Sequence, residues 1–96
     1  MSVHGEYSRA LESLLSRVRE LTDPAAAEWV EALTSARVDR NPDLSTAAGR
    51  CMDVLDALDA AVGVTRSTDC AGNAHYLRDP FDHLRAHCRS LLGIPS

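Results

Sequence analysis

The chain has 96 residues, of which 45% are hydrophobic and 25% are charged. A chain of this length and composition predicts one domain over residues 1–96, with enough apolar side chains for a core. Its 14 acidic residues outnumber its 10 basic residues and give a formal net charge of −4. Because phosphate recognition needs a basic surface, nucleic acid is not the favoured partner. No apolar run approaches the ~20 residues of a membrane span, so no membrane partner is expected.

The cysteines bear on the compartment in which the protein works. Cys51, Cys70 and Cys88 are odd in number, and their spacing is unlike that of a disulfide framework. No charged and then apolar leader precedes the first predicted helix. We therefore expect a reduced, cytoplasmic protein.

The first half of the chain predicts two helices. Apolar residues recur every three or four positions from Glu6 to Leu21, as on one face of a helix. They are Tyr7, Leu11, Leu14, Leu15, Val18 and Leu21. A second helix is expected to open at Asp23-Pro24, because aspartate caps free N–H groups and proline suits the first helical position. It should end before Asn41, and its apolar residues are Ala26, Trp29, Val30 and Leu33.

The second half predicts two more helices. The third should open at Asn41-Pro42 or Asp43 and end at Gly63, a residue type that readily adopts the left-handed conformation after a helix. Its apolar row is Leu44, Ala48, Cys51, Leu55, Leu58 and Val62. The fourth should open at Asp79-Pro80 by the same cap and proline signal. Its apolar row is Phe81, Leu84, Cys88 and Leu91.

The segment from Gly63 to Arg78 has no clear apolar period, and we predict a long connection there. Connections above ~12–15 residues are uncommon in compact domains unless they are functional or disordered. The other links are short and predict antiparallel neighbours. The expected fold is all-α, a compact antiparallel four-helix bundle with a long connection before the last helix.

A metal site is one candidate for chemistry. His83 and His87 are four residues apart, Cys88 follows them, and Cys70 and His75 lie upstream. Zinc needs three or four such ligands. A helix turns about 100° per residue, so Cys88 points into the apolar row while the two histidines lie on its flank. They share a metal only if the connection folds back, and we predict no metal and no other cofactor.

A second candidate is the segment Arg78-Asp-Pro-Phe-Asp-His83. Arginine can hold a phosphate and histidine can transfer protons, which together suffice for RNA cleavage. The segment resembles the Arg-x4-His motif of the HEPN ribonucleases, which are small helical bundles. The resemblance covers six residues and implies a catalytic role for Arg78 and His83.

Two further features are predicted to be structural. Asp53, Asp56 and Asp59 should form a solvated row on the third helix, away from its apolar stripe. Trp29 should complete the core with its indole N–H at the boundary.

Taken together, these patterns favour a small cytoplasmic helical module that binds another protein or itself over an enzyme. No Gly-x-Ser-x-Gly elbow or phosphate-binding glycine loop occurs. The expected binding residues are Arg66, Asp69, His75, Tyr76, Arg78, His83 and His87. The alternative is a HEPN-like ribonuclease or a metal-binding protein that uses Arg78, His83 and His87.

Overall fold

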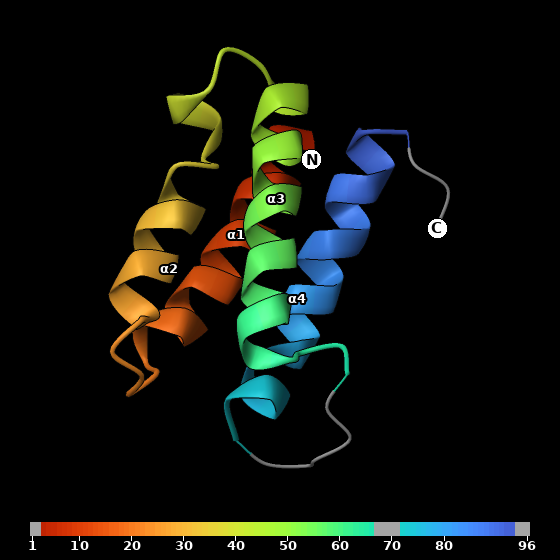
Figure 1. Ribbon diagram of the computed structural model, residues 1–96. Helices are drawn as coiled ribbons and strands as arrows, with labels where there is room; N and C mark the ends of the chain where they lie inside the picture. The colour runs from red at the N-terminus through yellow and green to blue at the C-terminus, as the bar shows by residue number, and fades with distance from the viewer. Residues whose placement is uncertain (1–2, 67–71, 94–96) are drawn as a thin grey trace.

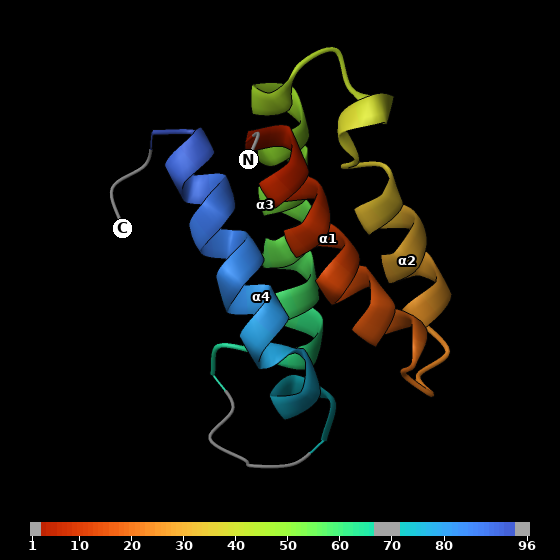
Figure 2. The same cartoon turned by 180° about the vertical axis from the view of Figure 1, so that it is seen from behind.

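A computed structural model describes residues 3–66 and 72–93 and confirms an all-α four-helix bundle (Figure 1). The elements are α1 (Val3–Arg19), α2 (Ala26–Thr34), the 3-10 helix η1 (Val38–Arg40), α3 (Leu44–Val62) and α4 (Gly72–Leu91). The four α-helices run alternately up and down, as Figures 1 and 2 show from opposite sides. Helix α1 packs against α2 and α4, and α3 packs against the same two helices.

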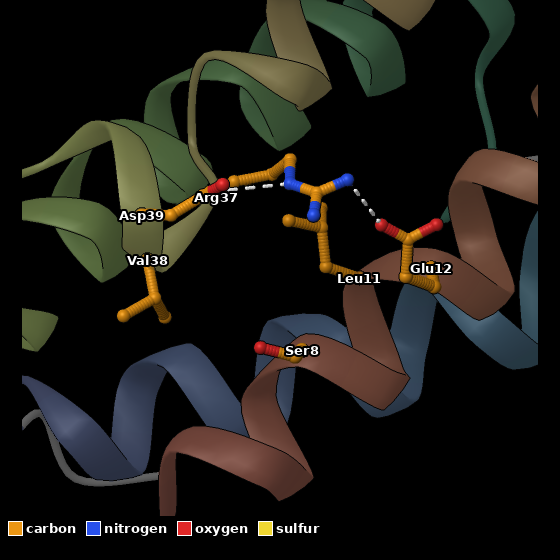
Figure 3. A pocket seen from close by; sticks show the side chains of 6 residues that line it. All are labelled: Ser8, Leu11, Glu12, Arg37, Val38 and Asp39. Atoms are coloured by element: carbon orange, nitrogen blue, oxygen red, sulfur yellow. Dashed lines mark hydrogen bonds and ion pairs between the residues drawn. The ribbon is translucent and has the colours of Figure 1, made fainter.

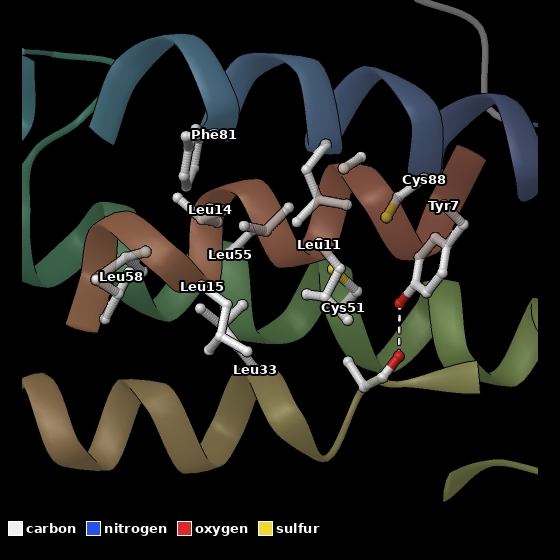
Figure 4. Close-up of a cluster of buried hydrophobic side chains, with 14 of the residues drawn as sticks. Tyr7, Leu11, Leu14, Leu15, Leu33, Cys51, Leu55, Leu58, Phe81 and Cys88 are labelled. Carbon is white, nitrogen blue, oxygen red and sulfur yellow. Dashed lines mark hydrogen bonds between the residues drawn. The ribbon is translucent and has the colours of Figure 1, made fainter. Parts of the chain in front are cut away.

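The core consists of side chains from all four α-helices (Figure 4). Leu11, Leu14 and Leu15 of α1 meet Leu33 of α2, Leu55 and Leu58 of α3, and Phe81 and Leu84 of α4. All of these are at most 1% exposed. Burial of each side chain stabilises the fold by roughly 1.5–3 kcal/mol before the entropy of ordering is subtracted. Trp29 is partly buried against this core, as predicted.

The first two helices differ from their predicted bounds at their ends. Helix α1 begins at Val3, three residues before the predicted Glu6. Helix α2 begins at Ala26 and is preceded by a turn, in which Asp23 Oδ1 accepts a hydrogen bond from the Ala25 N–H at 2.9 Å. Asp23 therefore closes a turn that leads into the helix, and the helix itself starts later than the cap signal predicted.

Helix α3 settles a choice that the sequence left open. Asp43 is its N-cap, and its side chain accepts from the Thr46 N–H at 2.7 Å. That hydrogen bond holds the pKa of Asp43 below its usual value. Asn41 instead donates its amide to the carbonyls of Ser35 and Arg37, at 3.0 and 2.6 Å, after α2 has ended. At the other end Gly63 has φ 75°, in the left-handed region, as predicted.

The predicted start of the last helix is wrong. Helix α4 begins at Gly72, and Pro80 lies inside it instead of opening it. Ala74 and Leu77 are buried and extend the apolar row of Phe81 toward the N-terminus in steps of three and four. Much of the predicted connection from Gly63 to Arg78 is therefore helical, because the apolar period continues upstream of the proline.

An arginine from another helix compensates for the internal proline. Pro80 has no N–H to donate to the carbonyl of Tyr76, four residues earlier. Arg17 Nη1 donates to that carbonyl at 2.7 Å. The helix thus crosses Pro80 with the exposed acceptor satisfied by α1.

Candidate functional site

The predicted binding residue Tyr76 joins α4 to the end of α1. The Arg17 guanidinium lies 5.1 Å from the centre of the Tyr76 ring, within cation–π range. The Tyr76 hydroxyl donates to a carboxylate oxygen of Glu20. Tyr76 is 39% exposed, and these contacts give it a structural role in holding the first turns of α4.

Arg66 lies at the C-terminal end of α3. Its Nη2 approaches the carbonyls of Asp59 and Ala60, each at 3.4 Å, where a cation interacts favourably with the end of a helix. Asp59 accepts two hydrogen bonds from Thr65, at 2.8 Å from the backbone N–H and 2.7 Å from the hydroxyl. Burial acts to raise the pKa of Asp59, but the bonds from Thr65 and the nearby guanidinium of Arg66 bring it below its usual value.

The acidic row on α3 follows the prediction in two of its three members. Asp53 and Asp56 are exposed, whereas Asp59 is half-buried and engaged by Thr65. The difference arises because the chain turns back over Asp59 after Gly63. Asp59 is thus part of the α3 terminus, and only the other two form a solvated face.

Of three other predicted residues, His75 and Arg78 lie on α4, and Asp69 lies outside the described residues. His75 is exposed, and Arg78 is half-buried. Arg78 and His83 are five residues apart on α4, which places their side chains about 140° apart around the helix axis. The HEPN-like pairing of Arg78 with His83 thus has no shared helical face here.

His83 and His87 do come together, in a groove between α1 and α4. The α1–α4 groove has a volume of about 500 Å³. It is lined by Glu6, Arg9, Ala10, Ser13, His83 and His87. Because positions 6, 9 and 13 fall on one side of α1, three polar side chains from that helix face the two imidazoles.

One histidine of this groove has an unusual environment. His87 is half-buried, and its ring centre lies 6.4 Å from that of Tyr7. Its Nε2 atom is buried and has no hydrogen-bond partner within the described part of the chain. An unpaired buried polar atom typically destabilises a protein by about 1–3 kcal/mol. His87 therefore lines the groove with a ring whose Nε2 atom is unpaired and shielded from solvent.

A second groove lies on the other side of α1, between that helix and η1 (Figure 3). The α1–η1 groove has a volume of about 320 Å³ and is lined by Ser8, Leu11, Glu12, Arg37, Val38 and Asp39. Arg37 donates to Glu12 at 3.0 Å and to Asp39 at 3.2 Å. The Arg37 and Glu12 side chains are 43% and 44% exposed, so this ion pair adds little stability and leaves its charges open to a partner.

The cysteines of the described chain belong to the core. Cys51 of α3 and Cys88 of α4 are fully buried and carry free thiols near Tyr7 (Figure 4). Cys88 donates toward Cys51, which together with burial raises the pKa of the Cys88 thiol. Cys88 is buried in the core and does not line the α1–α4 groove with the two histidines, as the helical geometry predicted. Among residues 3–66 and 72–93, no three histidine, cysteine or acidic side chains are grouped to hold a metal ion.

Sequence reasoning missed the α1 half of the groove. Glu6, Arg9 and Ser13 repeat at steps of three and four on one side of the α1 apolar row, and that spacing is the available signal. The packing of α1 against α4 decides which helix this stripe faces, and the sequence pattern of α1 does not indicate that packing.

None of the helices described is long and apolar enough to cross a membrane.

Comparison with known proteins gives no family and no relative from which a role for this site could be inferred. A scan of protein-family models, a search of curated proteins and a search of solved structures each found no match for this chain.

Proposed function

We propose that this chain is a small helical binding module that docks another protein, or a second copy of itself, along the exposed face of α1. The observation that carries the proposal is the pair of grooves on opposite sides of the N-terminal half of α1. A partner that lies across α1 can place side chains into both grooves at once.

The chemistry of this face suits a polar and reversible interface. Arg9 and Ser13 are exposed and line the α1–α4 groove, and Glu12 is half-buried and lines the α1–η1 groove. Charges of both signs line the two grooves, which favours specificity and fast association more than high affinity. Such a surface fits an accessory role in which the partner binds and leaves.

The test places one bulky charged side chain on this face and one on the opposite side of the bundle. Ser13→Arg places an arginine side chain on the exposed face of α1. Ala60→Arg is the matched control at an exposed position of α3. If the chain pairs with itself, sedimentation velocity shows an oligomer for the unaltered chain and for Ala60→Arg, but a monomer for Ser13→Arg. If the partner is another protein, the tagged chain keeps its co-purified partner with Ala60→Arg and loses it with Ser13→Arg.

The proposal fails if the two variants behave alike. Circular dichroism of both variants checks that the helices are intact. Equal retention of the oligomer or partner places the interface elsewhere on the surface, and loss in both variants reflects a general disturbance of the fold.

A second candidate function is an acid–base ribonuclease, favoured by two imidazoles and an arginine in the α1–α4 groove. In this version Arg9, and not Arg78, holds the phosphate, while His83 and His87 exchange protons with the substrate. Cleavage of a mixed-sequence RNA by the unaltered chain, lost in both His83→Ala and His87→Ala and kept in His75→Ala, is the expected result. Equal activity in all four proteins would identify a contaminant and reject this candidate.

A further inference from the structure

We propose that the α1–α4 groove binds an oxyanion, and that a phosphate group is the chemistry it fits best. Arg9, His83 and His87 bring nitrogen donors to the groove, and Ser13 brings a hydroxyl. Guanidinium and protonated imidazole groups make charge-assisted hydrogen bonds to phosphate oxygens, and a serine hydroxyl adds one more donor. This inference goes beyond the docking function, because the ligand is a small group and no partner protein is needed, and it does not depend on the RNA cleavage that the second candidate function requires of the same groove.

The unpaired nitrogen of His87 supplies a reason for a ligand to bind. In the free protein His87 Nε2 is buried and has no partner among the described residues, so the free state carries the cost of an unmade hydrogen bond. A ligand removes that cost only if it pairs with Nε2 itself. Because Nε2 is buried, the ring has to rotate about Cβ–Cγ to bring this nitrogen into the groove.

Glu6 is the member of the groove that opposes an anion. Its carboxylate lies in the first turn of α1, where the helix dipole stabilises negative charge. It repels a phosphate at the same place, whereas it would attract a divalent cation. The effect of removing this one charge therefore has opposite signs for an anion site and for a cation site.

Groups of both charges, together with one neutral hydroxyl, surround the two imidazoles of the groove. The groups that surround the imidazoles are Glu6, Arg9 and Tyr7 of α1, together with Asp79 one turn before His83 on α4. Burial raises the pKa of the Tyr7 hydroxyl, which therefore stays neutral near pH 7. In its protonated form each imidazole donates from both ring nitrogens, which favours an anion in the groove.

The experiment is a titration of the full chain with sodium phosphate at pH 6 and constant ionic strength, followed by NMR of the imidazole nitrogens. The His83 and His87 signals should shift along a saturating curve. His75, exposed on the same helix but outside the groove, is the internal control and should not follow that curve. Dimethyl phosphate in a parallel titration shows whether the site takes a free phosphate or a phosphodiester, and saturation by either ion supports the proposal.

Two variants distinguish an anion site from a cation site. Glu6→Gln should bind phosphate several-fold more tightly, and His83→Ala should bind it about tenfold more weakly, as expected for loss of a charge-assisted hydrogen bond. The backbone NMR spectrum of each variant confirms folding. Unsaturated shifts that include His75 would mean an adventitious ion only and overturn the proposal. Weaker phosphate binding by Glu6→Gln would also overturn it.

Discussion

At the scale of single residues, Tyr7 shows how a predicted core residue acquires a second role. Its ring is fully buried, as its place in the apolar row of α1 predicted. Its hydroxyl donates to the Ala36 carbonyl at 2.6 Å and also lies 3.1 Å from the Ala47 carbonyl. The row of apolar residues predicts burial of Tyr7, but its partners lie 29 and 40 residues away, and no local pattern identifies them.

Replacement of Tyr7 by phenylalanine tests the worth of that hydroxyl. Tyr7→Phe keeps the ring but leaves the buried Ala36 carbonyl without its donor, so the free energy of unfolding should fall by about 1–3 kcal/mol. Tyr76→Phe, at the exposed tyrosine, is the control and should cost less than about 1 kcal/mol. Urea unfolding measures both variants, and an equal loss in the two would contradict the buried hydrogen bond.

Tyr7 also makes the free energy of unfolding depend on pH in the alkaline range. Burial raises the pKa of Tyr7 above the value of about 10 that tyrosine has in an unfolded chain. Its contribution to stability is fully present below pH 10. It falls by up to about 1.4 kcal/mol per pH unit above that, because the unfolded state releases the proton first.

Tyr7→Phe lacks this titration, so the difference in unfolding free energy between the unaltered chain and the variant should narrow from pH 9 to pH 11. Urea unfolding at each pH provides the measurement. A constant difference would show that Tyr7 titrates alike in the folded and unfolded states.

At the scale of elements, α4 shows that capping residues and prolines do not always predict where a helix starts. For α3 the sequence left Asn41-Pro42 and Asp43 open, and the N-cap is Asp43, which no proline follows. At Asp79-Pro80 the cap and proline signal failed, because a missing intrahelical hydrogen bond is tolerated when another element satisfies the carbonyl. Arg17 of α1 does so, and its contact with Tyr76 depends on the fold of the whole bundle.

A double-mutant cycle tests this compensation. Arg17→Ala removes the donor to the Tyr76 carbonyl and should destabilise the chain by about 1 kcal/mol. In a Pro80→Ala background the new N–H can pair with that carbonyl, so the same change should cost less, with a coupling of about 0.5–1 kcal/mol. Thermal or urea unfolding of the four proteins provides the values.

Arg19→Ala, at an exposed position in the same turn of α1, is the control for loss of a positive charge. Arg19→Ala should lower the free energy of unfolding by the same amount with and without Pro80. If Arg17→Ala also costs the same in both backgrounds, the Arg17 contact does not replace the missing helical bond.

At the scale of the whole molecule, the fold class was predictable and the surface was not. The apolar rows of α1, α3 and α4 specify which residues are buried, and those rows predicted the bundle. They do not specify how the polar flank of one helix meets its neighbour. His83 and His87 were visible as a pair in the sequence, whereas Arg9 and Ser13 joined them only through the packing of α1 against α4.

The central claim is that the exposed face of α1, between its two grooves, is where a partner or a second copy docks. Site-specific photo-crosslinking in the native cell tests it most directly, with a photoreactive side chain at Ser13 in one protein and at Ala60 in another. We predict a covalent adduct, identified by mass spectrometry as this chain or one other protein, from Ser13 and none above background from Ala60. Adducts of equal yield at the two positions, or an adduct from Ala60 alone, would contradict the account.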